Sequence, residues 1–177
     1  MCGIVAYIGN KDPKPIILDG LERMEYRGYD SAGILLCNNF ESQLTKISGK
    51  VDSLSKILET KQQISTHLGI GHTRWATHGI PDEKNAHPHI SNSGKLHIVH
   101  NGIIENFDTI KKELSQRGYS FYSDTDSEVL VNLIDEIKVK ENVKLSKAVQ
   151  LALNQVVGAY GVCLLYTSDA ADDTDSV

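Results

Sequence analysis

Cys2 directly follows the initiator methionine, and its position suggests chemistry more strongly than that of any other residue. Once Met1 is removed, Cys2 carries both a thiol and the free α-amine of the chain. The thiol could attack a carbonyl carbon, while the amine, whose pKa is about 7.7–8.0 in peptides, could take up and return the proton. The position therefore indicates an N-terminal nucleophile. The alternative is a small buried apolar residue, which most free cysteines are.

An arginine and a tryptophan adjoin each other in GIGHTRWATHG, residues 69–79. The G-x-G in this stretch does not indicate a dinucleotide site, because Arg74 stands where that fingerprint requires its third glycine. At the end of a predicted strand, Arg74 is suited to bidentate binding of a carboxylate, and an ordinary surface arginine is the alternative. Trp75, the only tryptophan, either packs in the core or covers a ligand.

Two further stretches place polar residues at the ends of predicted elements. In HNGIIEN, residues 100–106, we expect Asn101 and Gly102 to turn the chain between a strand and a helix. Such a turn can direct a side-chain N–H and a backbone N–H at one point, which would form an oxyanion hole; otherwise it is an ordinary turn. In SDTDSEV, residues 123–129, Asp126 either caps the following helix or directs its carboxylate at a cationic ligand.

The histidines do not form a recognisable metal motif. His87 and His89 are close together in NAHPH, but the chain has no H-E-x-x-H and no cysteine near them. Zinc sites usually show a full set of closely spaced ligands, and this stretch has only two histidines close together. We therefore expect no metal site, and we interpret the histidines of this region as loop and strand residues that form hydrogen bonds. They are His72, His78, His87, His89, His97 and His100.

The composition predicts one domain with a sizeable core, because the chain has 177 residues, of which 40% are hydrophobic. The formal net charge is −5, and four of the acids fall in the last nine residues. The sequence has no basic stripe of the kind that nucleic acid requires. Three cysteines without C-x-x-C spacing indicate reduced thiols in the cytoplasm. We expect no secretory signal and no membrane span.

The elements that must position these residues mix strands and helices without strict alternation, which predicts an α+β fold. Thr125 and Glu128 have the spacing of a capping box. We expect a domain over residues 2–166 that is truncated at its C-terminus, and a disordered tail foreign to it over residues 167–177. The predicted strands are 3–9 (buried), 31–37, 43–48, 68–74, 95–101 and 159–166, and the predicted helices 11–28, 51–60, 106–118, 125–138 and 145–156.

Taken together, the motifs resemble those of the class II glutamine amidotransferases, which use an N-terminal nucleophile. The resemblance covers residues 1–166 and keeps the order of the family's motifs. Amidophosphoribosyltransferases read Gln-His-Arg-Gly-Gln-Asp where this chain has EYRGYD, and they lack RWATHG, so the chain resembles them less. The motifs are CGIVAYIG, LERMEYRGYDSAG, GIGHTRWATHG, NAHPH, HNGIIEN and TDSEV.

The resemblance implies a role for each matching residue. Cys2 would be the nucleophile, and Asn101 and Gly102 would form the oxyanion hole. Arg74 would bind the α-carboxylate of L-glutamine, and Asp126 its α-ammonium. The supporting roles would fall to Thr77 and His78 beside Arg74, to Trp75 in a loop that closes over glutamine, and to Arg27, which would place the N-terminal residue. The implied fold is the four-layer αββα sandwich of the N-terminal nucleophile hydrolases.

The implied activity is hydrolysis of glutamine to glutamate and ammonia through a γ-glutamyl thioester on Cys2, without a cofactor. In the members it most resembles, a sugar-phosphate isomerase domain, absent from this chain, uses the ammonia to convert fructose 6-phosphate to glucosamine 6-phosphate. The full-length enzyme would be a homo-oligomer. Two alternatives remain open at this point: a glutaminase domain with another ammonia acceptor, and a non-catalytic glutamine-binding module.

Overall fold

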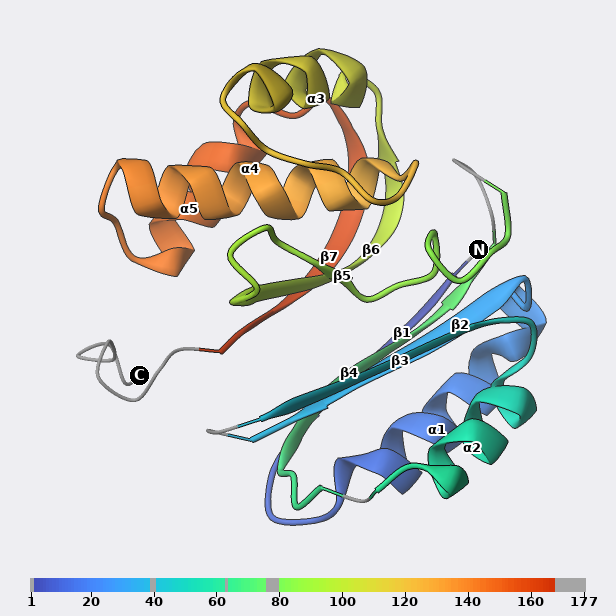
Figure 1. Cartoon of the computed structure of the whole chain (residues 1–177). Helices are drawn as coiled ribbons and strands as arrows, with labels where there is room; N and C mark the ends of the chain where they lie inside the picture. Colours follow the sequence, from blue (N-terminus) through green and yellow to red (C-terminus); the bar gives the residue numbers. More distant parts are fainter. Residues whose placement is uncertain (1, 39–40, 63, 76–79, 168–177) are drawn as a thin grey trace.

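Two antiparallel sheets pack face to face, and helices cover the outer face of each (Figure 1). The computed structural model describes residues 2–38, 41–62, 64–75 and 80–167. Helices α1 and α2 lie on one side of this sandwich, and α3, α4 and α5 lie on the other. The arrangement is therefore α+β with four layers in the order αββα, which confirms the predicted fold class.

The first sheet has the strand order β1-β4-β2-β3 and the second has the order β5-β6-β7, with every pair antiparallel. The strands are β1 (Gly3–Ile8), β2 (Ser31–Cys37), β3 (Ser42–Ser48), β4 (Leu68–Arg74), β5 (His89–Ile90), β6 (Leu96–Ile104) and β7 (Gly158–Tyr166). The helices are α1 (Pro13–Met24), the 3-10 helix η1 (Glu25–Arg27), α2 (Val51–Thr60), α3 (Phe107–Gln116), α4 (Asp126–Lys140) and α5 (Leu145–Leu153).

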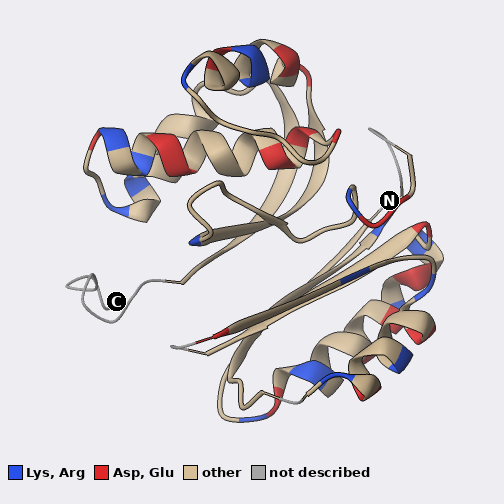
Figure 2. Ribbon diagram, in the orientation of Figure 1, with Lys and Arg blue, Asp and Glu red and all other residues tan. Residues whose placement is uncertain are grey.

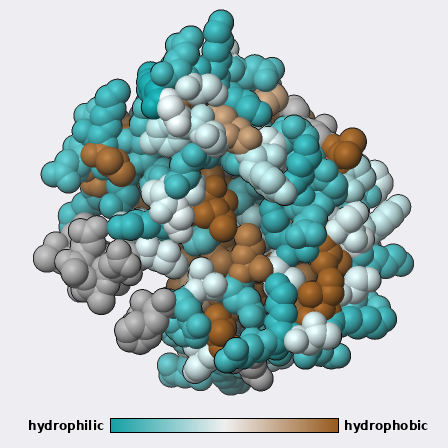
Figure 3. Space-filling view, in the orientation of Figure 1, coloured by the Kyte–Doolittle hydropathy of each residue, from teal (hydrophilic) through white to brown (hydrophobic). Residues whose placement is uncertain are grey.

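Apolar side chains join these layers in three clusters. One lies between α1, α2 and the first sheet, and another lies between the second sheet and α3, α4 and α5. The third joins the two sheets across the middle of the sandwich and includes Leu35, Ile70, Val99 and Leu165. Charged residues lie mainly on the outer helices and loops (Figure 2), and hydrophobic surface gathers between the two sheets on the face shown in Figure 3. This packing holds the ends of the central strands in fixed relative positions.

Helix starts follow local signals in the sequence. Asp12 accepts a hydrogen bond from the amide of Lys14 at the start of α1, where Pro13 needs no donor partner. Thr125 caps α4 by accepting from the amide of Glu128. The Glu128 carboxylate, however, accepts from the amides of Tyr122 and Ser123 rather than from that of Thr125, so the reciprocal half of the capping box is replaced.

Three predictions about elements are wrong in detail. Strand β1 is not buried, because it lies at the edge of its sheet, and Ile8 is 75% exposed. Strand β6 continues through Asn101 and Gly102 to Ile104, so these two residues lie within a strand instead of turning the chain into a helix. The short strand β5 lies in a polar stretch whose composition gave no periodic signal.

The described residues form no helix that is long and apolar enough to cross a membrane. The last described residue, Thr167, follows β7 and donates from its amide to the carbonyl oxygen of Lys95. Residues 168–177 lie outside the described residues, so the expectation of a tail foreign to the domain stays a prediction.

Candidate active site

A cavity of about 480 Å³ opens where the start of β1, the end of β4, the middle of β6 and the start of α4 come together. It contains seven of the nine residues to which the resemblance assigns a role, although they are spread over more than 120 positions of the chain. The lining residues are Cys2, Arg27, Arg74, Trp75, His87, His100, Asn101, Gly102, Ile103, Thr125, Asp126 and Ser127.

Cys2 is held in this cavity by contacts with the end of β4. The amide of Trp75 donates to its Sγ at 3.2 Å, and the Sγ in turn lies 3.6 Å from the carbonyl oxygen of Trp75. The next residue, Gly3, donates its amide to the hydroxyl of Thr73. These contacts fix the thiol at the end of β4, in the lining of the cavity.

Arg74 is the last residue of β4 and is only 3% exposed. Its guanidinium donates from Nη1 to the carbonyl of Ile80 at 3.3 Å. Burial lowers the pKa of this guanidinium, and negative charge at Cys2, Asp30, Asp82 and Asp126 acts in the opposite direction. An arginine stays protonated under such shifts, so the cavity contains a fixed positive charge.

The 3-10 helix η1 brings Arg27 to the same cavity, because the chain after it passes close to the end of β4. A Cβ atom on Gly28 would lie 2.9 Å from the carbonyl carbon of Arg74 and from the amide nitrogen of Trp75. Only glycine allows this approach. Trp75 itself is 47% exposed and makes an edge-on contact with the ring of Tyr29.

Asn101 and Gly102 lie in β6, facing the start of β1. The Asn101 amide donates from Nδ2 to the carbonyl oxygen of Cys2 at 3.1 Å, and its Oδ1 lies 2.9 Å from His72 Nε2. Because Nδ2 carries two hydrogens, one remains after the bond to Cys2. Gly102 has a φ of +137°, and a Cβ there would collide with the carbonyl oxygen of Ala159 on β7.

Asp126 is the first residue of α4 and is 4% exposed. Its Oδ2 accepts from the amide of Ile104 at 2.9 Å, and its Oδ1 lies 3.8 Å from His100 Nδ1. The carboxylate is thus anchored to the end of β6, and the amino end of α4 favours its negative charge. The cavity therefore holds one fixed positive and one fixed negative group.

Four buried histidines cluster beside the cavity, and the sequence did not show that they meet there. His87 and His100 line the cavity, and the rings of His72 and His89 pack against that of His87. His87 Nε2 and His100 Nδ1 lie 2.8 and 2.9 Å from the hydroxyl of Ser127, and His89 Nε2 lies 3.0 Å from that of Thr125. The residues of these contacts lie in the motifs NAHPH, HNGIIEN and TDSEV, which were the signal for them in the sequence. The His72 and His87 rings lie 4.2 Å apart, and those of His87 and His89 lie 4.6 Å apart.

Burial keeps three of these rings neutral, those of His72, His87 and His89. It lowers the pKa of His72 to about 4, and it lowers the pKa of His87 and of His89 well below the usual range. His97 differs from the expectation that the histidines form hydrogen bonds, since neither of its ring nitrogens has a partner. Thr77 and His78 lie outside the described residues. Within the described segments, no three His, Cys, Asp or Glu side chains are arranged to hold a metal ion.

Comparison with known proteins gives the family. A family profile described as "Glutamine amidotransferase domain" matches residues 59–148. Glutamine–fructose-6-phosphate aminotransferase (isomerizing) of Bacteroides thetaiotaomicron is 54% identical over 166 residues, and the enzyme of that name from Pyrococcus horikoshii is 47% identical over 170. These matches cover 93% and 96% of this chain but 27% and 28% of the relatives, so the chain spans about a quarter of their length.

Solved structures agree with this result. The structure titled as the allosteric regulatory enzyme of purine biosynthesis superposes with a TM-score of 0.80 at 26% identity. Glutamine phosphoribosylpyrophosphate amidotransferase from B. subtilis gives a TM-score of 0.75 at 25% identity. Each match covers 92% of this chain and 35% of the other. With its four-layer fold and its family profile, the chain belongs to the glutamine amidotransferase domain family.

Proposed function

We propose that this chain is the glutaminase part of a glutamine–fructose-6-phosphate aminotransferase, and that the cavity binds and hydrolyses L-glutamine. The observation that supports it best is the position of Cys2 Sγ in one cavity with the Asn101 amide, the Arg74 guanidinium and the Asp126 carboxylate. A substrate with two opposite charges at one end and a primary amide at the other matches these groups. The assignment to a glutamine–fructose-6-phosphate aminotransferase rests on the name of the longer relatives.

The reaction begins with attack of the Cys2 thiolate on the side-chain amide carbon of glutamine. An S–C bond forms, and the amide oxygen becomes an oxyanion that accepts from Asn101 Nδ2 and from the Gly102 amide. The geometry supports this role, because Nδ2 has a second hydrogen beyond its bond to Cys2. In a mature chain that begins at Cys2, the α-amine takes the thiol proton and passes it to the departing nitrogen, and the C–N bond breaks to release ammonia.

The γ-glutamyl thioester then reacts with water. The α-amine takes a proton from this water, and a second oxyanion forms at the same site. The S–C bond breaks, glutamate leaves and the thiol takes back its proton. No step requires a metal or a cofactor, because each consists of a proton transfer and an acyl transfer that the amine and the two donors can support.

The remaining residues of the site would select the amino acid. Arg74 would bind the α-carboxylate through two parallel hydrogen bonds, and Asp126 would bind the α-ammonium. Thr77 and His78 would lie beside the carboxylate, Trp75 would cover the bound glutamine, and Arg27 would help to place the N-terminal residue. The buried, pre-positioned carboxylate of Asp126 supports its part of this assignment.

The partner for ammonia is part of the same proposal. In the longer protein, a sugar-phosphate isomerase domain outside this chain would convert fructose 6-phosphate to glucosamine 6-phosphate, in a cytoplasmic homo-oligomer that binds neither nucleic acid nor membrane. Residues 2–166 would be an incomplete glutaminase domain, and residues 167–177 would be foreign to it. Identity of 54% to an enzyme of this name, against 25% to the phosphoribosylpyrophosphate enzyme, favours this acceptor.

The test is glutamate release from glutamine by the full chain and by two cysteine variants. We expect activity in the native protein and in Cys163→Ala, whose thiol lies in β7 away from the cavity, and none in Cys2→Ala. Activity that survives Cys2→Ala would exclude the proposed nucleophile. Binding of glutamine without hydrolysis by the native chain would instead indicate a non-catalytic module.

A further inference from the structure

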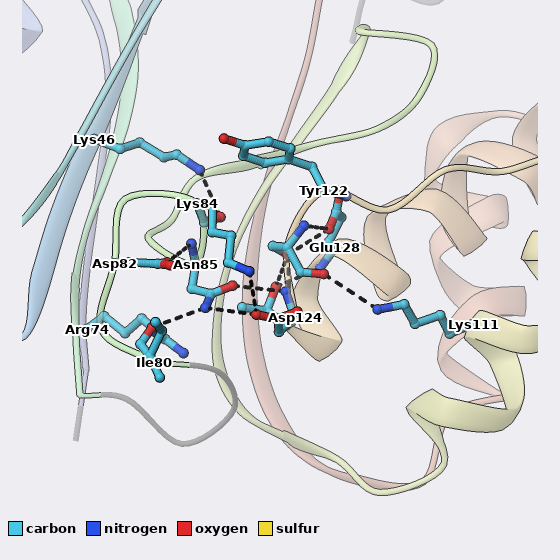
Figure 4. Close-up of polar contacts among 12 residues, drawn as sticks. Lys46, Arg74, Ile80, Asp82, Lys84, Asn85, Lys111, Tyr122, Asp124 and Glu128 are labelled. Carbon is cyan, nitrogen blue, oxygen red and sulfur yellow. Dashed lines mark hydrogen bonds and ion pairs between the residues drawn. The ribbon is translucent and has the colours of Figure 1, made fainter.

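Asn85, in the segment between Ile80 and β5, is fully buried and links two parts of the chain through its side chain. Its Nδ2 donates to the carbonyl oxygen of Ile80 at 3.1 Å, and its Oδ1 accepts from the amide of Asp124 at 2.9 Å. Its own amide donates to Asp82. Figure 4 shows Asn85 between Ile80 on one side and Asp124 on the other. The side-chain amide thus spans from the segment next to Arg74 to the segment next to α4.

At the first end, Asn85 and Arg74 share one acceptor. The carbonyl oxygen of Ile80 receives Asn85 Nδ2 and also Arg74 Nη1, the latter at 3.3 Å (Figure 4). A carbonyl with two lone pairs can accept both bonds. Asn85 therefore holds the oxygen against which the guanidinium of Arg74 is oriented.

At the second end, Asn85 holds the residues that lead into α4. Asp124 lies two positions before Asp126, and its amide donates to Asn85 Oδ1. Lys84 also pairs with the Asp124 carboxylate at 2.8 Å, but the two side chains are 35% and 55% exposed, so this ion pair contributes little to the link. The buried amide of Asn85 is the shielded part of the connection.

We infer that Asn85 is a positioning residue for the amino-acid end of the substrate, and that it fixes the Arg74 guanidinium and the Asp126 carboxylate relative to each other. The inference rests on the proposed function, in which these two groups bind the α-carboxylate and the α-ammonium. Asn85 does not line the cavity, so it acts through Ile80 and Asp124 and not by touching the substrate. Both charges of an amino acid are attached to one carbon, so the spacing of their two partners must be held closely.

The experiment compares two reagents that alkylate Cys2 in the full chain: a diazoketone analogue of glutamine, which carries both charges, and iodoacetamide, which carries neither. The variant is Asn85→Asp, which keeps the acceptor for the Asp124 amide, loses the donor to Ile80 and to the Asp124 carboxylate, and adds a charge beside Asp124. We expect alkylation by the glutamine analogue to slow by about tenfold or more, because misplaced binding groups lose rate steeply. Alkylation by iodoacetamide should stay within about twofold of the native rate, since that reagent uses neither group.

A matched control exists in Asn132→Asp. Asn132 is also fully buried, donates from Nδ2 to a backbone carbonyl, that of Glu128, and accepts from a backbone amide, that of Asn92, but it does not line the cavity. Asn132→Asp should lower neither alkylation rate. Asn85→Ala is the second variant. It removes the side-chain amide without adding a charge, and it should slow alkylation by the glutamine analogue but not by iodoacetamide.

Equal losses with both reagents, or no loss in a folded variant, would overturn the inference. Failure of both Asn85 variants to fold would also overturn it, because Asn85 would then hold the domain together instead of positioning the two groups. The proposed function has its own test in the native chain. It fails if the glutamine analogue alkylates Cys2 no faster than iodoacetamide does and if free glutamine does not slow alkylation by the analogue.

Discussion

The side chain of Asn101 donates a hydrogen bond to the carbonyl oxygen of Cys2 at 3.1 Å, although the two residues are 99 positions apart. This bond ties the start of β1 to the middle of β6, and so joins the edge of one sheet to the centre of the other. It places the second hydrogen of Asn101 Nδ2 beside the thiol-bearing residue. The proposed nucleophile and the proposed oxyanion donor are therefore fixed relative to each other before substrate binds.

For Asn101→Ala, we expect kcat for glutamine hydrolysis to fall by about 10²–10³, with a much smaller change in KM. Removing one oxyanion donor costs about 3–4 kcal/mol of transition-state stabilisation. Steady-state kinetics measure this effect, and the rate of Cys2 alkylation by iodoacetamide shows whether the cysteine has moved. A variant that loses only affinity for glutamine would place Asn101 in substrate binding instead.

Arg74→Lys and Asp126→Asn should each lower glutamine hydrolysis by at least about tenfold, or about 1.4 kcal/mol. Lysine cannot reproduce the bidentate geometry of arginine, and asparagine lacks the charge that pairs with the α-ammonium. The loss should shrink for a simple primary amide without charged groups, which never used these partners. Equal relative losses on both substrates would mean that the two residues support the fold.

Gly102→Ala should destabilise the domain by about 1–3 kcal/mol or more, because a φ of +137° strains any other residue and a Cβ would collide with Ala159. Thermal unfolding measures the loss. The control is Gly161→Ala, on the facing strand β7, where a Cβ would meet nothing within 4 Å. Similar stability of the two variants would show that β6 does not need glycine at position 102.

The stability of the domain should fall as the pH drops from about 6.5 toward 4. Burial lowers the pKa of His72 and that of His97 to about 4, so the unfolded chain binds protons in this range while the folded chain does not. Each such histidine contributes up to about 1.4 kcal/mol per pH unit across the window. Above about pH 6.5 both states are deprotonated, and the effect disappears.

Denaturant unfolding at several pH values tests this dependence, with His97→Leu as the variant. Its ring nitrogens have no partners, so leucine removes the titration without breaking a hydrogen bond. We expect a shallower pH dependence for His97→Leu and an unchanged one for His67→Leu, which is on the exposed surface. Identical slopes for the native chain and His97→Leu would contradict the buried neutral state.

Much of this architecture follows from local sequence patterns. Thr125 caps α4 as the capping-box spacing indicates, and Arg74 ends its strand as predicted. The prediction that Cys2, Asn101 and Asp126 belong to one site came from the resemblance of the motifs and not from periodicity. The sequence did not show that β6 runs on past Asn101 to Ile104, because the Asn-Gly pair is a strong turn signal and only the pairing with β7 overrides it.

The long-range contacts were the least predictable part of the site. Asn85 lies in a polar stretch without periodicity, and its partners come from residues 80 and 124, which no local rule connects. Ile57 has helical spacing with Leu54 and Leu58 but is 40% exposed, because the buried stripe of α2 is narrower than the apolar pattern. The partners of Asn85 and the exposure of Ile57 depend on which elements pack together, and the spacing of residues along the chain does not determine this packing.

The most direct test of the central claim is to identify the residue that the diazoketone analogue of glutamine modifies. The full chain is treated with the analogue, with and without excess glutamine, and the adduct is mapped by peptide mass spectrometry together with the identity of the first residue. We predict one adduct, on Cys2 of chains that lack Met1, that glutamine suppresses. Modification of Cys37 or Cys163 instead, or full hydrolytic activity in chains that retain Met1, would contradict an N-terminal cysteine nucleophile.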